Sequence, residues 1–519
     1  MRLVIFHYHF LPGGVSQVIT SSSVAILKYL PEIEEIILVS GKKDNTDNIV
    51  SAIASKISST KRKAQIRGAI VPEIGYTTDL KKIPSVKDLK QIVNKQFKGC
   101  LWWIHNYHLG KNPIFTEAIL QIAEENSEQK IILQIHDFPE ASRYGNMSNL
   151  YRNIKHPLYP ISPNIKYITI NSRDYKFLIA AGIPKEIVFL LNNPVEPQYI
   201  DNDIKKKGLD KKKIDRILGK ASTAYIKEAP LLIYPIRTIR RKNVLEAGLL
   251  AKCSRMPVNL IPTLPGISKS EKPYSELVAS CFSEGLIPGS AQAGIILEKK
   301  GLSFPDIINA GSVIISSSVQ EGFGYLFINS LLWEKPLLAR QLDIINDFKS
   351  IFNPNFSHFY NNVKIPLRSK LRKQLSDDYD KKITKLKLIL PADIVLKLKD
   401  DKYNLLKKNT IDFSFLSPIM QKKFFESLKD RQLLKETCHL NSNIIGQMER
   451  MLLLDEFKFD NTKIDRFNLV NHAKQIQKII NRPPPGLSGK PIQDTNDIHN
   501  NMLSFFADFP SISLLYDPI

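Results

Sequence analysis

A stretch around Glu321 constrains the fold most, because it combines a buried strand, a glycine loop and a helix. The β-branched run 313–315 predicts a buried strand. Three serines end this strand, and Glu321 with the Gly-Phe-Gly run 322–324 follows. Apolar residues then recur at helical spacing over 325–333, before a second strand over 336–339. This order predicts a βαβ unit, whose loop offers free N–H groups to an anion at the start of the helix.

The same alternation of strands and helices extends over most of the chain, which predicts an α/β fold with two Rossmann-like domains. A length of 519 residues exceeds that of one ordinary domain. The predicted parts are an N-terminal domain (1–195), a charged linker (196–228), a C-terminal domain (229–345 with 441–480), a helical insertion (346–440) and a loosely packed C-terminal tail (481–519).

From the three serines to Lys335-Pro336, the chain resembles the retaining nucleotide-sugar glycosyltransferases of the GT-B fold, in particular family 4. The resemblance extends over 1–345 and 441–480, where the last helix is similar to one that crosses back to the first domain in that family. It implies two Rossmann-like domains facing a cleft, with a helical insertion in the second. It also implies transfer of a hexosyl group from a nucleotide-sugar to an acceptor hydroxyl, with retention of the anomeric configuration.

The resemblance assigns roles to residues in both halves. Arg237 and Lys242 match the family's Arg/Lys pair, and fixed cations there would stabilise the charge that builds on a leaving diphosphate. The family also implies that Glu321 and His136 contact the donor sugar. The predicted catalytic residues are therefore His136, Arg237, Lys242 and Glu321, and the predicted donor-binding residues are Gly13, Gly14, Gly322, Phe323, Gly324 and Asn329. Asn329 stands where the family has an acid for the nucleotide ribose, so an uncharged and weaker contact is expected.

The acceptor is expected at the ends of strands in the first half, where α/β sheets place their ligands. The strand over 100–104 leads into His105, Asn106 and His108, which we predict as acceptor-binding residues together with Arg143. The two histidines could instead bind a metal or serve the structure, but no further convergent metal ligand is visible. The resemblance implies no metal and no cofactor apart from the nucleotide-diphosphate sugar as co-substrate.

A formal net charge of +22 is compatible with general compositional bias, or with an anionic partner such as a phosphorylated or glycan acceptor or an acidic membrane surface. No zinc-ligand spacing or RNA-binding aromatic signature favours nucleic acid. Four dispersed cysteines and the absence of a signal peptide or long apolar run predict a cytoplasmic protein, either soluble or at the inner face of a membrane. The Asp-x-Asp string at 201–203 lies in the polar linker and predicts a solvated turn.

Three other functions stay open from the sequence. Because Asn329 replaces an acid, the chain could be a catalytically silent binder of nucleotide-sugars or glycans on the same fold. It could also be a GT-B phosphorylase or epimerase. A charge-driven nucleic-acid binder would show a steep dependence of binding on salt.

Overall fold

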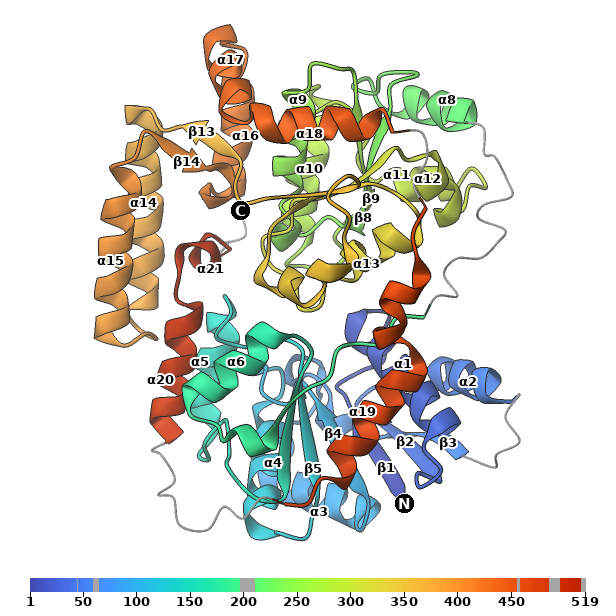
Figure 1. Ribbon diagram of the computed structural model, residues 1–519. Helices are drawn as coiled ribbons and strands as arrows, with labels where there is room; N and C mark the ends of the chain where they lie inside the picture. Colours follow the sequence, from blue (N-terminus) through green and yellow to red (C-terminus); the bar gives the residue numbers. More distant parts are fainter. Residues whose placement is uncertain (44, 59–64, 197–210, 455–457, 485–494, 515–519) are drawn as a thin grey trace. The chain divides into compact units, whose positions relative to one another are not determined.

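The computed structural model describes residues 1–519 with the exception of 44, 59–64, 197–210, 455–457, 485–494 and 515–519 (Figure 1). The chain divides into two compact units. The first unit contains 1–196, 389–391 and 462–507, and the second contains 197–388, 392–461 and 508–519. Each unit is built on its own parallel sheet, which confirms the predicted α/β class with two Rossmann-like domains.

A seven-stranded parallel sheet in the order β3-β2-β1-β4-β5-β6-β7 forms the centre of the first unit. Strand β1 shows why these segments read as continuous apolar runs: Leu3 and Ile5 pack on one face, and Val4 and Phe6 on the other. The strands are β1 (Arg2–Phe6), β2 (Glu35–Ser40), β3 (Gln65–Ile70), β4 (Leu101–His105), β5 (Ile131–Ile135), β6 (Ile165–Thr169) and β7 (Val188–Leu190).

Helices cover both faces of this sheet. One apolar cluster unites residues of α1 (Gly14–Tyr29), α2 (Thr46–Ile57) and α19 (Leu469–Asn481). The cluster on the other face draws on α3 (Val86–Phe97), α4 (Pro113–Glu125), α5 (Tyr144–Asn153), α6 (Ser172–Ala181) and α20 (Thr495–Phe506). Helix α19 lies beside α1 in Figure 1, so the terminal helix returns to the first unit as the resemblance implied.

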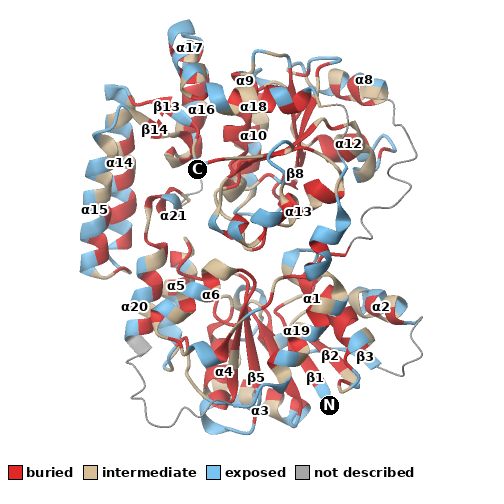
Figure 2. Cartoon of the chain, in the orientation of Figure 1, coloured by how far each residue is buried: buried red, intermediate tan, exposed pale blue. Residues whose placement is uncertain are grey.

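The second unit contains a five-stranded parallel sheet in the order β12-β11-β10-β8-β9. Figure 2 shows its strands buried among the surrounding helices. The strands are β8 (Leu231–Arg237), β9 (Asn259–Leu264), β10 (Val313–Ser316), β11 (Leu337–Arg340) and β12 (Ser357–Tyr360). The helices are α8 (Lys211–Ala221), α9 (Val244–Lys252), α10 (Lys272–Ser283), α11 (Ala293–Glu298), α12 (Phe304–Ala310), α13 (Tyr325–Leu332), α14 (Ser369–Leu386), α15 (Ala392–Leu406), α16 (Pro418–Ser427), α17 (Arg431–Leu440), α18 (Ser442–Leu452) and α21 (Phe509–Ser513).

Two predicted boundaries are wrong. The predicted linker includes α8, whose Ile214 and Leu218 lie one helical turn apart and are buried in the core of the second unit. Because its lysines make the segment look polar, this apolar face was not evident from the sequence. The predicted helical insertion includes β12, which pairs with β11 at the edge of the sheet. It also contains the antiparallel pair β13 (Lys364–Pro366) and β14 (Thr410–Asp412). The Asp-x-Asp string at 201–203 lies outside the described residues.

The C-terminal tail is not loosely packed, contrary to the prediction. Ile498, Met502 and Phe506 of α20 are buried in the core of the first unit. Their spacing of four residues places them on one face of the helix. This apolar pattern is short and follows a proline-rich segment, so it is easily overlooked in the sequence. Helix α21 belongs to the second unit, where the ring of Phe509 packs on Tyr379 and Phe415.

Replacing Met502 with alanine should destabilise the first unit by about 2–3 kcal/mol, because it leaves a cavity in a core where Met502 is fully buried. Thermal or urea unfolding would measure the loss. The matched control is Asn500→Ala, an exposed position on the same helix, which should stay close to wild type. Equal stability of the two variants would contradict the packing of α20.

Candidate functional site

In the second unit, the ends of β8 and β10 bring the predicted donor residues together. The serines after β10 hold the basic loop after β8: Ser317 Oγ donates to the carbonyl oxygens of Lys242 (3.2 Å) and Asn243 (2.9 Å). The backbone N–H of Val319 donates to the carbonyl oxygen of Arg241 at 2.9 Å. The serine-rich strand end therefore fixes one loop against the other.

A compact ion cluster lies at this edge, formed by Lys242, Arg241 and Glu321. Lys242 Nζ donates to one carboxylate oxygen of Glu321, and Arg241 Nη1 lies 3.1 Å from the other. The side chains of Lys242 and Glu321 are only 12% and 11% exposed. The structure thus brings two predicted catalytic residues, from loops about 80 positions apart in the sequence, into direct contact.

Burial and charge set the protonation of this cluster. Burial alone would raise the pKa of Glu321, but the charges of Lys242 and Arg241 outweigh it and lower this pKa to about 2. Burial, partly offset by Glu321, lowers the pKa of Lys242. The carboxylate is therefore ionised at neutral pH and available as a hydrogen-bond acceptor for hydroxyl groups.

The depressed pKa of Glu321 predicts a dependence of stability on pH. Because the pKa is lower in the folded chain than in the unfolded chain, Glu321 stabilises the fold above about pH 5, and this contribution is lost as the pH falls toward 2. The difference in melting temperature between wild type and Glu321→Gln should therefore shrink between pH 6 and pH 3. The control Glu298→Gln, an exposed site on α11, should show no such trend. A constant difference for Glu321→Gln would contradict the shift.

The remaining candidates of the second unit lie at the end of β8, in the loop after β10 and on α13. Arg237, at the end of β8, is 3.7 Å from Glu271, and its charge also acts on Lys242. Gly324 caps α13 with φ +88°, and a Cβ there would lie 2.7 Å from the ring of Phe327, so this position requires glycine. Phe323 is buried, whereas Gly322 is half-buried. Asn329 is half-buried on α13, where its carbonyl oxygen accepts from the N–H of Trp333.

Residues of the predicted insertion form hydrogen bonds that hold the basic loop after β8 in place. Arg240, the buried neighbour of the ion cluster, donates to the carbonyl oxygens of Ser414 and Leu416, both at 3.1 Å. Gln421 Nε2 of α16 donates to Asn243 Oδ1 at 3.1 Å. These contacts tie residues 414–421 of the predicted insertion to the backbone that carries Lys242.

A buried ionic network continues this support. Arg340, at the end of β11, contacts the carboxylates of Glu246 and Asp412, with 2.8 Å from its guanidinium nitrogens to each oxygen of Asp412. Tyr360 donates to Glu246 Oε1 at 2.9 Å, and Asn243 Nδ2 donates to Glu246 Oε2 at 2.8 Å. One network therefore joins α9, β11, β12 and β14 to the end of the basic loop.

In the first unit, three histidines meet at the carboxyl edge of the sheet. The rings of His105 and His136 stack, with 2.9 Å between His105 Nδ1 and His136 Nε2. Burial lowers the pKa of His136 to about 4 and that of His7 to about 3, and it also lowers the pKa of His105 well below the usual range. All three rings are thus neutral at physiological pH, and they can donate or accept hydrogen bonds without charge.

The predicted acceptor residues differ in how far the structure exposes them. His105, Asn106 and His108 are buried, and Asn106 Oδ1 accepts from the backbone N–H of His136 at 2.8 Å. The ring of His108 packs among those of Tyr107, Phe138 and Tyr159, a position in the core rather than at the surface. Arg143 is partly exposed and pairs with Asp137 at 2.9 Å.

The two glycines predicted to bind donor lie at the start of α1. Gly13 has extended backbone, and an added Cβ would have its nearest neighbour 3.8 Å away; around Gly14 the space is open. The structure therefore shows no steric need for glycine at either position, and their role stays a prediction.

Several residues of these edges were missed from the sequence. Arg241 stands between two other basic residues, so only the structure shows that it faces Glu321 while Arg240 points into the core. His9 and Tyr76 lie several residues beyond β1 and the largely exposed β3, so the sequence carries no clear signal for them. Lys111 lies in the loop after the buried β4, where the rule on strand ends was the available signal.

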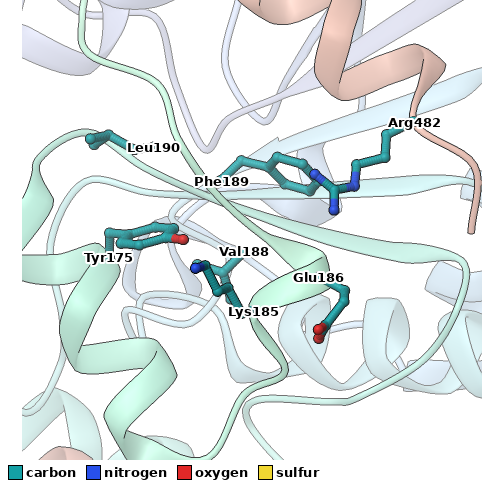
Figure 3. Close-up of a pocket in the computed structure, with 7 residues that line it drawn as sticks. All are labelled: Tyr175, Lys185, Glu186, Val188, Phe189, Leu190 and Arg482. Atoms are coloured by element: carbon teal, nitrogen blue, oxygen red, sulfur yellow. The ribbon is translucent and has the colours of Figure 1, made fainter. Parts of the chain in front are cut away.

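A separate pocket of about 370 Å³ lies beside the edge strand β7 in the first unit (Figure 3). Its lining combines charged and apolar side chains, and the guanidinium of Arg482 lies over the ring of Phe189 at 5.5 Å. It is lined by Tyr175, Lys185, Glu186, Val188, Phe189, Leu190 and Arg482. None of the predicted site residues takes part in it.

The described part of the chain holds no group of three or more His, Cys, Asp or Glu side chains that could bind a metal ion. Within the same residues, no helix combines the length and apolar character needed to cross a membrane.

The sequence comparison decides the family. The chain is 34% identical, over 529 aligned residues, to the mannosylglucosyl-3-phosphoglycerate synthase of Petrotoga mobilis, with 99% of both chains covered. The chain belongs to the family of this synthase. Membership in the synthase family confirms the prediction of a glycosyltransferase at the level of the enzyme class. No protein-family model matches the chain.

Solved structures with a similar arrangement include HepE of Anabaena in complex with UDP and glucose, at 12% identity and a TM-score of 0.46, covering 92% of this chain and 98% of that one. Sucrose-phosphate synthase of Thermosynechococcus elongatus gives 12% identity and a TM-score of 0.45, with coverage of 92% and 98%. The α/β class with two Rossmann-like domains rests on the two parallel sheets of this chain itself.

Proposed function

We propose that this chain transfers a mannosyl group from a nucleotide-diphosphate sugar to a phosphorylated glucosyl-glycerate acceptor, with retention at the anomeric carbon as in glycosyltransferase family 4. The full-length identity to a mannosylglucosyl-3-phosphoglycerate synthase supports the choice of sugar and acceptor. The ion cluster of Lys242, Arg241 and Glu321 is the observation that carries the proposal, because it combines cations for a diphosphate with an ionised acceptor for sugar hydroxyls.

In the proposed reaction, the bond between the anomeric carbon and the diphosphate oxygen breaks, and the acceptor oxygen bonds to that carbon. The acceptor proton passes to the leaving phosphate on the same face. Lys242 and Arg237 stabilise the charge of the departing diphosphate, and preorganised cations act more strongly in a buried site than in water. Glu321 and the backbone of 322–324 orient the sugar.

His136 takes the role of a neutral hydrogen-bonding group near the reacting bond. Burial holds its pKa at about 4, so the ring is uncharged at physiological pH. His105, whose Nδ1 shares a hydrogen bond with Nε2 of His136, acts as a positioning residue that fixes the orientation of the His136 ring. No step of this scheme requires a metal or a further cofactor.

The proposal is tested by incubating the protein with UDP-, GDP- and ADP-sugars and glucosyl-3-phosphoglycerate. We expect release of nucleoside diphosphate together with a mannosylated product, and NMR of the new linkage should show the anomeric configuration of the donor. Failure of transfer with every donor, or inversion, would overturn the proposal.

Asn329, which stands where the resemblance implies an acid, favours one alternative, a protein that binds nucleotide-sugars without turnover. The same incubations separate it, because that protein would gain thermal stability with a nucleotide and release no diphosphate. An incubation with inorganic phosphate as the acceptor would distinguish a phosphorylase, because that enzyme would form sugar 1-phosphate. The cytoplasmic location and the contact with an acidic membrane surface stay predictions.

A further inference from the structure

Five loops at the carboxyl edge of the first sheet each contribute one polar ring or cation to a group that we call the rim cluster. Its members are His9, Lys42, Tyr76, Lys111 and Arg143. They follow β1, β2, β3, β4 and β5, which are neighbours in the sheet, so the loops meet at one edge. His9 Nε2 lies 3.1 Å from the hydroxyl of Tyr76, and Lys111 Nζ lies 5.3 Å from the centre of the Tyr76 ring.

The charges of the rim cluster do not balance. Lys42 pairs with Asp79 at 2.7 Å, and Arg143 pairs with Asp137 at 2.9 Å. The ion pairs found among the described residues include none with Lys111, although this side chain is half-buried. Burial and the charge of Arg143 both lower the pKa of Lys111, as expected for an ammonium beside a like charge and without a carboxylate. An anionic ligand would remove this imbalance.

The backbone that carries Lys111 is fixed before any ligand arrives. Its carbonyl oxygen accepts from the N–H of Thr77 at 3.0 Å, and Asn112 Nδ2 donates to the carbonyl oxygens of Glu73 (2.8 Å) and Gly75 (2.7 Å). Gly110 has φ +66°, and a Cβ there would lie 2.3 Å from the carbonyl oxygen of Asn146 on α5. The loop of Lys111 is thus held against the loop of Tyr76 and the helix that follows Arg143, an arrangement that lowers the entropy lost on binding.

We propose that Lys111 and Arg143, with the hydroxyl of Tyr76, bind the phosphate monoester of the acceptor and so select phosphorylated over unphosphorylated acceptors. This inference rests on the proposed function for the identity of the acceptor. Arg143 keeps guanidinium N–H groups beyond the nitrogen that contacts Asp137, so it can hold a phosphate and the carboxylate together. Lys111 supplies the charge that no carboxylate of the described chain neutralises.

Calorimetry with 3-phosphoglycerate and glycerate as probes tests the site without turnover. Wild type should bind 3-phosphoglycerate about 10–100 times more tightly than glycerate, and Lys111→Met should abolish this preference. Lys111→Arg should retain it, which separates loss of charge from misfolding. The matched control is Lys90→Met, since Lys90 is a largely buried lysine of the same unit that pairs with Glu125.

Two results would overturn the site: equal binding of both probes by wild type, or a preserved preference in Lys111→Met. A parallel loss of glycerate and 3-phosphoglycerate affinity in Lys111→Met would assign the site to the carboxylate and refute the phosphate. Steady-state kinetics then separates the two proposals. If phosphate preference depends on Lys111 but no sugar is transferred, the anion site stands and the proposed function fails.

Discussion

Replacing Lys242 with alanine should lower kcat by about 100- to 1,000-fold while the nucleotide-sugar still binds. Removal of one preorganised group that stabilises transition-state charge has effects of this size, because the charge on the diphosphate is largest as the glycosidic bond breaks. Lys242 is buried against Glu321, and the serines after β10 fix its backbone. Release of nucleoside diphosphate at saturating donor would measure kcat, and calorimetry would measure donor binding.

Two variants sharpen this test. Lys242→Arg keeps the charge and should recover part of the rate, whereas Lys252→Ala removes an exposed lysine from α9 and should leave kcat unchanged. A normal kcat in Lys242→Ala would refute the role of Lys242 at the diphosphate. A rate lowered equally by Lys242→Ala and Lys252→Ala would point to general electrostatics instead.

Replacing Arg340 with methionine should destabilise the second unit by roughly 3–5 kcal/mol, the range for buried ion pairs that lose one partner. The substitution leaves the carboxylates of Glu246 and Asp412 close together without their cation, and their side chains are 0% and 11% exposed. Urea or thermal unfolding would measure the loss. Because Glu246 also bonds Asn243, we further expect weaker donor binding at temperatures where the variant is folded.

Arg368→Met is the matched control. Arg368 also contacts two carboxylates, those of Asp430 and Glu436, but all three side chains are about half exposed. Solvent-exposed pairs of this kind contribute roughly 0–1 kcal/mol, so the control should lose little stability. Similar losses in both variants would show that burial of the Arg340 network has no special energetic role.

The sequence allowed the location of the site to be predicted, but not its contacts. Apolar β-branched runs marked the buried strands, and the polar residues directly after them had to lie at one edge of each sheet. The resemblance to family 4 singled out Lys242 and Glu321, and the structure brings the two side chains into contact. The sequence did not distinguish Arg241 from Arg240, because the direction of side chains in a short loop depends on contacts made by distant residues such as Ser414 and Leu416.

The buried polar residues were hardest to predict. His105 and His108 looked like ligand-binding groups because they are polar and follow a strand, yet the structure buries both. Whether such a ring lies in the core or at the surface depends on aromatic neighbours such as Phe138 and Tyr159 from other segments. The same limit applies to Asp412 in the insertion, whose partner Arg340 lies 72 residues earlier in the sequence.

The burial of α19 and α20 in the first unit has a consequence for biosynthesis. The ribosome completes residues 1–196 early, yet the core of that unit also contains Ile476 and Met502, which are synthesised about 300 residues later. At roughly 5–20 residues per second, about 300 further residues occupy the ribosome for on the order of 15–60 s. During this interval the nascent segment 1–196 exposes the apolar surface that these helices later cover, so its dependence on chaperones should end only after α19 and α20 have been synthesised.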